Sequence, residues 1–174
     1  MKNIKSIVFS ALIVALMLTL PLIFHAIPNG GKLFSPLHLP AFLSGFILSP
    51  AFALLSTIVG LFLSALLTGM PAPFMLPQMA AELMCYALFT CFLFRFIRTR
   101  YVLADIYIAL FASMIAGRAV AGILNALIFS RGEYSLLIWF TSYFVSTLPA
   151  MILQLAVIPP LVIALIKRSV IERK

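Results

Sequence analysis

Long apolar runs separated by short turn-rich segments constrain this chain more than any other feature of its sequence. Of its 174 residues, 64% are hydrophobic and only 9% are charged, and the mean hydropathy is +1.22. Soluble domains carry about 25% charged residues, so this composition is far from theirs. Most side chains must therefore face lipid or other apolar side chains. We predict an all-α membrane protein that forms a single integral membrane domain over residues 1–174.

Six apolar runs follow one another along the chain, and a membrane helix needs about 20 residues. The runs cover residues 4–27, 37–48, 51–67, 74–97, 103–129 and 134–166. We therefore predict a bundle of six transmembrane helices. The second run is short and contains Pro40 and Gly45, so we expect a tilted, broken or partly re-entrant helix there. In the sixth run, Pro149 and the pair Pro159-Pro160 predict a kink or an early stop.

The positive charges predict the orientation of this bundle, because cytoplasmic loops of membrane proteins are enriched in lysine and arginine. With six spans, one side of the membrane receives most of the 12 lysines and arginines. These are Lys2, Lys5, Arg95, Arg98, Arg100, Lys167, Arg168, Arg173 and Lys174. Only Lys32 and Arg131 fall on the other side. We expect both termini in the cytoplasm, and topology accounts for the net charge of +8 without nucleic-acid binding.

The sequence contains no pattern typical of an enzyme or a metal site. It has four acidic residues in all, and neither a phosphate-binding glycine loop nor a nucleophile elbow. His25 and His38 occur without a cluster of metal ligands around them. We predict that the chain is not an enzyme and binds neither metal nor cofactor. Any ATP-driven step belongs to another protein.

Two opposite charges, Glu82 and Arg118, lie inside the fourth and fifth apolar runs. A charge at the centre of a membrane helix costs roughly 2.5 to 3.5 kcal/mol on insertion scales, so it usually faces a partner, a cavity or a substrate. The two residues lie about 12 and 16 Å from the outer ends of their spans at 1.5 Å per residue. We expect them to meet at a polar chamber in the outer half of the membrane. The alternative is an ion pair that only ties two helices together.

Other polar and aromatic side chains recur at helical spacing in the last three runs, so those of one run share a face. The predicted substrate-binding set is Gln78, Glu82 and Tyr86 in the fourth run, Arg118 and Asn125 in the fifth, and Trp139, Tyr143 and Thr147 in the sixth. The alternative for the polar members is hydrogen bonding within the bundle. For Trp139, it is a place in the aromatic belt at the membrane interface.

Small residues form two further stripes, which allow another helix to approach closely. Ala11 and Ala15 form one in the first run, and Ser56, Gly60 and Ser64 form the other in the third. Either stripe can pack inside the bundle. If the first faces lipid, it becomes a docking surface for a partner membrane protein.

Several segments together resemble the substrate-binding S components of energy-coupling factor (ECF) vitamin transporters. They are residues 11–15 (ALIVA), 37–46 (LHLPAFLSGF), 63–71 (LSALLTGMP), 82–86 (ELMCY) and 117–118 (GR). The resemblance implies a high-affinity vitamin receptor in the bacterial plasma membrane. It also implies two kinds of partner. One is a membrane coupling subunit that contacts Ala11 and Ala15, and the other is a pair of cytoplasmic ATPases that hydrolyse ATP.

The resemblance further implies a binding pocket in the outer half, capped by the loop between the first two spans. The expected lid residues are Asn29, Gly30, Gly31 and Lys32. Arg118 would suit an acidic or amide-bearing substrate such as pantothenate, while cobalamin, folate, and pyrimidine or queuosine precursors remain alternatives. Two other classes of function stay open at this point. One is a proton-coupled secondary transporter that uses Glu82, and the other is a membrane scaffold that transports nothing.

Overall fold

Five helices of the structure are long and apolar enough to cross a membrane. They are α1 (Lys2–His25), α4 (Pro50–Thr68), α5 (Leu76–Phe96), α6 (Val102–Leu124) and α8 (Leu148–Lys167). The structure is a computed structural model that describes residues 2–25, 27–28, 30–129 and 135–171, and no strand occurs in these ranges. The predicted all-α membrane fold is therefore confirmed. Five of the six expected spans are present as long helices.

The second predicted span is the short helix α3 (His38–Ile47) at the centre of the bundle. Its ten residues reach about 15 Å at 1.5 Å per residue, half the thickness of a bilayer core. All residues from His38 to Phe46 are buried, and α3 contacts α1, α4, α5 and α8. Pro40 lies in its first turn, where proline is tolerated, so the helix is unbroken. A sixth crossing of the membrane stays a prediction.

The last apolar run forms two helical parts instead of one long helix. A short helix α7 (Leu136–Phe140) and a π-helix η3 (Thr141–Val145) precede α8, which begins at Leu148 with Pro149 in its first turn. Proline fits there because the amide hydrogens of a first turn have no partner within the helix. The predicted kink thus lies just before Pro149. The stop considered at Pro159-Pro160 is absent, since α8 continues to Lys167.

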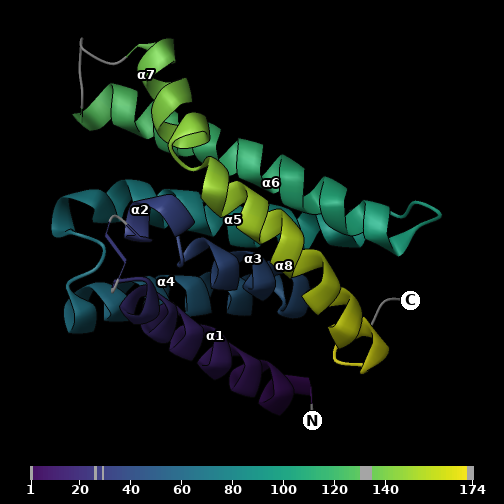
Figure 1. The fold of residues 1–174 in the computed structure, drawn as a ribbon. Helices are drawn as coiled ribbons and strands as arrows, with labels where there is room; N and C mark the ends of the chain where they lie inside the picture. Colours follow the sequence, from purple (N-terminus) through teal and green to yellow (C-terminus); the bar gives the residue numbers. More distant parts are fainter. Residues whose placement is uncertain (1, 26, 29, 130–134, 172–174) are drawn as a thin grey trace.

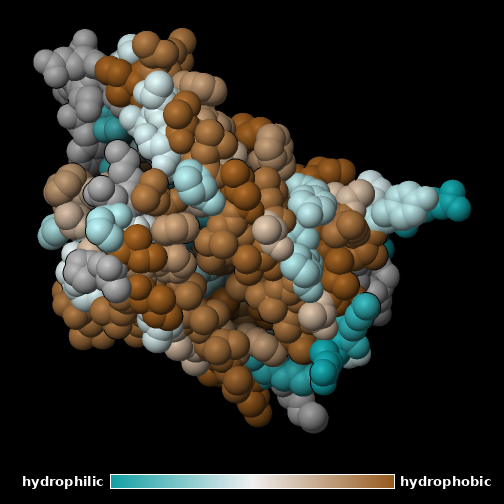
Figure 2. Space-filling view, in the orientation of Figure 1, coloured by the Kyte–Doolittle hydropathy of each residue, from teal (hydrophilic) through white to brown (hydrophobic). Residues whose placement is uncertain are grey.

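The two ends of the bundle differ in charge. Figure 1 places the beginning of α1, the end of α8 and the α5–α6 connection at one end, called the terminal end below, and the α4–α5 connection and α7 at the opposite end. Figure 2 shows an extensive apolar surface between them. Exposed cations at the terminal end are Lys5, Arg95, Arg98, Arg100, Lys167 and Arg168. This separation matches the charge pattern that underlies the predicted orientation, which itself stays a prediction.

The stripe of small residues on α4 packs inside the bundle. Ser56, Gly60 and Ser64 are all buried. A Cβ atom at Gly60 would lie 3.0 Å from the Cβ of Met17, so α1 passes directly over this glycine. The stripe therefore serves the α1–α4 contact.

The alanine pair on α1 has the opposite environment. Ala11 and Ala15 are exposed, whereas Ile13 and Met17 on the other side of the helix are buried. This pair therefore lies on an open outer face of the bundle.

Replacing Gly45 by alanine is expected to destabilise the bundle. A Cβ there would lie 2.5 Å from the carbonyl oxygen of Ala87 and 2.8 Å from the Cβ of Thr90, so α3 would have to move away from α5. Overpacking of this kind costs about 1–3 kcal/mol. The thermal unfolding midpoint in detergent should fall clearly. The matched control is Gly31→Ala, whose added Cβ meets nothing within 4 Å. Equal midpoints for Gly45→Ala and the control would contradict this packing.

Candidate functional site

A cavity of about 530 Å³ lies at the end of the bundle opposite the terminal end. Five α-helices contribute to its wall: α1, α2 (Gly30–Phe34), α3, α5 and α6. The π-helices η2 (Asn125–Phe129) and η3 contribute as well. The segments that join α2 to α3, α4 to α5 and η3 to α8 complete it. The polar side chains in that wall are Ser35, His38, Gln78, Glu82, Arg118, Asn125, Ser142, Tyr143 and Thr147. Apolar side chains fill the rest, including three methionines at positions 70, 75 and 79. Such a mixture is typical of small-molecule sites.

The cavity brings together most of the residues that the sequence indicated. Gln78, Glu82, Arg118, Asn125, Tyr143 and Thr147 line it. Gly31 of the expected lid lines it as well, and Gly30 is buried nearby in α2. Asn29 and the side chain of Lys32 lie outside the described part of the chain. Tyr86 and Trp139 are absent from the lining and stand behind it.

Tyr86 supports Glu82 from within α5. The Tyr86 hydroxyl donates a hydrogen bond to Oε1 of Glu82, four residues earlier and on the same face. The Tyr86 ring stacks on Phe42 of α3, with ring centroids 4.3 Å apart. On the side of α6, the ring lies against Gly117, where any side chain would overlap it. Tyr86 is thus fixed by its neighbours, and it holds the Glu82 carboxylate at the cavity wall.

Arg118 is the largest fully buried side chain in the described part of the chain, with 1% of its surface exposed. Neither terminal guanidinium nitrogen, Nη1 or Nη2, has a hydrogen-bond partner among the described residues. Its Cζ lies 5.2 Å from the centroid of the Phe144 ring, which provides a cation–π contact. Glu82 is close enough to interact with Arg118 electrostatically, but the two side chains do not form a hydrogen-bonded ion pair. Arg118 thus lines the cavity with two donor groups that are buried and unpaired among the described residues.

Trp139 connects α7 to the backbone that carries Arg118. Its indole Nε1–H donates a hydrogen bond of 3.0 Å to the carbonyl oxygen of Arg118. The indole ring lies against Gly122, one helical turn further along α6, where a Cβ would overlap it. Its other face meets Phe144 edge-on, at 5.3 Å between ring centroids. Trp139 therefore positions Phe144 and Arg118 without lining the cavity itself.

Two π-helical turns contribute side chains to the cavity. Asn125 begins η2, which continues α6, and Ser142 and Tyr143 lie in η3. A π-helical turn holds more residues than an α-helical one, so it shifts the register of the following side chains, and such turns are frequent at functional sites. Arg118 in α6 and Asn125 at the start of η2 were expected to face one site, and both line this cavity.

His38 is the main cavity residue that the sequence reasoning did not include. It is buried at the start of α3, its Nδ1 has no hydrogen-bond partner, and its ring meets that of Tyr86 at 5.1 Å. The sequence considered it only as a metal ligand, and no group of three potential metal ligands occurs among the described residues. Because the second apolar run is short, α3 begins inside the bundle, at the depth of the cavity. The shortness of that run is the sequence signal that could have indicated His38.

The profile of the family described as "ECF transporter, substrate-specific component" matches residues 5–162. The chain belongs to this family. The resemblance seen in the sequence is thereby confirmed. No curated protein and no solved structure matches the chain. Members of the family are binding subunits of transporters rather than enzymes. This S component is therefore a substrate-binding subunit of a membrane transporter, which disfavours both the secondary transporter and the scaffold.

Replacing Gly122 by alanine is expected to displace Trp139, because the new Cβ would overlap the indole ring. The hydrogen bond to the Arg118 carbonyl would then break. Trp139 is the only tryptophan in the chain, so its fluorescence reports this contact directly. The emission maximum should move to longer wavelength. The neighbouring exposed position provides the control, Ile123→Ala, which should leave the emission unchanged. An unchanged spectrum in Gly122→Ala would contradict the packing of α7 on α6.

Proposed function

We propose that this S component captures a vitamin-sized micronutrient from outside a bacterial cell. In this proposal the bundle crosses the plasma membrane six times, with α3 as the short second crossing. The terminal end then faces the cytoplasm, in agreement with the cations exposed there. The cavity at the opposite end would face the exterior and admit the substrate.

The observation that carries this proposal is the state of Arg118. It is a buried cation in the wall of a cavity of about 530 Å³, and both of its terminal nitrogens lack hydrogen-bond partners in the described ranges of the chain. Burying a charge without hydrogen bonds is costly, so a binding site that is filled in its working state accounts best for this arrangement. The ligand would supply an acceptor such as a carboxylate or an amide oxygen.

The other side of the cavity defines a second requirement. The Glu82 carboxylate accepts from Tyr86 and retains further acceptor capacity for hydroxyl or amide donors. A molecule with an acceptor at one end, a donor elsewhere and an apolar body would match Arg118, Glu82 and the methionines of the wall. Pantothenate has a carboxylate, an amide and hydroxyl groups, and it is our first candidate.

Helix α2 is proposed as part of a lid. It follows directly after α1, and Gly31 on it lines the cavity. Because glycine permits large backbone changes, the segment from Asn29 to Lys32 is suited to open and close over a ligand.

We further propose that Ala11 and Ala15 dock the membrane coupling subunit, which works with two cytoplasmic ATPases. The support is their exposure on the outer face of α1, where a small-x-x-x-small pair lets a partner helix approach closely. This chain would supply the substrate, and the ATPases would supply the energy.

Arg118→Ala is expected to weaken vitamin binding by at least about 100-fold. Two hydrogen bonds from a charged group contribute roughly 1.5–3 kcal/mol each, and 1.4 kcal/mol corresponds to a factor of ten. The experiment is native mass spectrometry of the purified protein against a panel of vitamins, followed by titration calorimetry with the vitamin that binds.

The matched control for that variant is Arg100→Ala, which removes an exposed arginine at the terminal end of the bundle. It should bind like the wild-type protein. Unchanged affinity in Arg118→Ala, with a wild-type unfolding midpoint, would remove Arg118 from the site. Failure of the wild-type protein to bind any member of the panel at submicromolar concentration would overturn the pantothenate-like substrate class.

Ala15→Trp is expected to leave vitamin binding intact and to block uptake by the complete transporter. The large side chain would prevent a partner helix from approaching α1 closely, whereas the cavity is formed by other surfaces. The measurements are vitamin affinity of the isolated subunit and vitamin uptake by cells that contain all subunits.

Ile115→Trp is the control, because Ile115 is exposed on α6, away from the alanine pair. This variant should show normal binding and normal uptake. Normal uptake with Ala15→Trp would exclude the docking role of this face.

A further inference from the structure

A second hollow, at the terminal end of the bundle, is separate from the substrate cavity. Its volume is about 510 Å³, and we call it the basic groove. It lies where α1, the end of α3, the end of α5 and the segment after α8 meet. No described residue lines both this groove and the substrate cavity. The proposed capture of a vitamin therefore makes no use of it.

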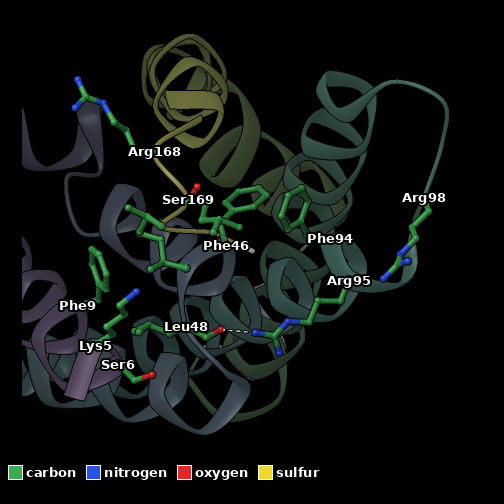
Figure 3. A pocket seen from close by; sticks show the side chains of 13 residues that line it. Lys5, Ser6, Phe9, Phe46, Leu48, Phe94, Arg95, Arg98, Arg168 and Ser169 are labelled. Carbon is green, nitrogen blue, oxygen red and sulfur yellow. Dashed lines mark hydrogen bonds between the residues drawn. The ribbon is translucent and has the colours of Figure 1, made fainter. Parts of the chain in front are cut away.

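Four cations from three parts of the chain line the basic groove: Lys5 of α1, Arg95 and Arg98 at the end of α5, and Arg168 after α8. None of the described residues in its lining is acidic. Figure 3 shows Lys5 and Arg98 extending toward the hollow from opposite sides, while Arg168 points away at its rim. The Nη2 of Arg95 donates a hydrogen bond of 2.8 Å to the carbonyl oxygen of Leu48, so this guanidinium is anchored at the end of α3.

The deeper part of the groove is apolar. Phe46 and Phe94 are buried there and meet edge to face, with ring centroids 4.9 Å apart. Phe9 of α1 and Leu48 add to the same surface. The hollow thus combines a cationic rim with an aromatic and aliphatic floor.

The segment after α8 closes the groove through a defined turn. The amide of Ser169 donates to the carbonyl of Ile166, and that of Val170 donates to the carbonyl of Leu165, both at 3.0 Å. This is the Schellman pattern, with Ser169 in the left-handed position at φ 55°. The turn directs Ile171 back into the bundle, where it is 7% exposed and lines the groove.

The usual excess of positive charge on one side of a membrane protein explains why cations occur at this end. It does not explain why cations from three segments, α1, the end of α5 and the end of α8, line one concave, apolar-floored hollow. An anionic phospholipid offers both complementary parts in one molecule, a phosphate group for the cations and a glycerol and acyl region for the floor. Basic pockets between transmembrane helices are known to hold such headgroups.

We propose that the basic groove binds the phosphate headgroup of one anionic phospholipid of the surrounding leaflet. Lys5 and Arg98 attract the phosphate from opposite sides of the groove, Arg95 stays anchored to Leu48 and adds its charge, and the glycerol region lies against Phe46 and Phe94. A soluble phosphate would satisfy the cations but would leave the apolar floor without a partner.

The test is native mass spectrometry of the full chain in detergent, titrated with phosphatidylglycerol or with phosphatidylcholine of the same acyl chains. The wild-type protein should retain one phosphatidylglycerol and release phosphatidylcholine. The double variant Lys5→Gln with Arg98→Gln should bind phosphatidylglycerol roughly 25-fold more weakly, about five-fold for each cation removed. The matched control is Arg100→Gln with Lys167→Gln, which removes the same charge from exposed positions outside the groove. It should retain the lipid as the wild-type protein does.

Three results would overturn the proposal: equal retention of both lipids, equal weakening in both double variants, or displacement of phosphatidylglycerol by inorganic phosphate at comparable concentration. The last would identify a soluble anion as the ligand. If the groove variant does not fold, the single variant Lys5→Gln carries the same comparison with an expected change of roughly five-fold. Vitamin binding at the opposite end is measured in parallel, so failure of the lipid proposal and failure of the proposed transport function remain distinguishable.

Discussion

A buried charge in an apolar bundle is the constraint on which the rest of this structure depends. Arg118 lies in a helix surrounded by hydrocarbon, where a charge is tolerated only if neighbouring groups compensate it. The structure supplies those neighbours through close contacts between helices. Gly117 lets α6 approach Tyr86 and Glu82 on α5, and Gly122 admits Trp139 from α7 on the other side. Larger residues at either glycine would separate the elements that surround the charge.

The same constraint connects the bundle to its function as the binding subunit of an ECF transporter. The carboxylate of Glu82 is held by Tyr86, but the terminal nitrogens of Arg118 have no hydrogen-bond partner in the part of the chain that the structure describes. Glu82 retains further acceptor capacity, and the compensation of the Arg118 charge is thus incomplete. A ligand with an acceptor group would complete it, which couples the energetics of the fold to substrate capture. The π-helical turns that carry Asn125 and Tyr143 add side chains to the same wall.

Much of the fold was predictable because lipid imposes simple rules on a sequence. Apolar runs of sufficient length become helices, and their ends lie at turn residues and charges, as α1, α4, α5 and α6 show. The last run was predicted as one span with a kink or an early stop at its prolines, but periodicity cannot locate the π-helical turn before Pro149. Gln78, Glu82 and Arg118, which helical spacing indicated, all line the cavity. Helical spacing missed His38, since the position of that residue follows from how far the short helix α3 sits inside the bundle.

The sequence by itself determined the class of protein, the places of the long helices and the faces that carry polar groups, because these follow from hydropathy and from the 3.6-residue period. Tertiary structure alone decided which of those groups meet. Tyr86 and Trp139 share the predicted spacing, yet they stand behind the cavity, since the rotation of each helix is set by contacts at glycines with neighbouring helices. The convergence of Lys5, Arg98 and Arg168 around one hollow likewise depends on packing between segments far apart in the chain, which no local pattern encodes.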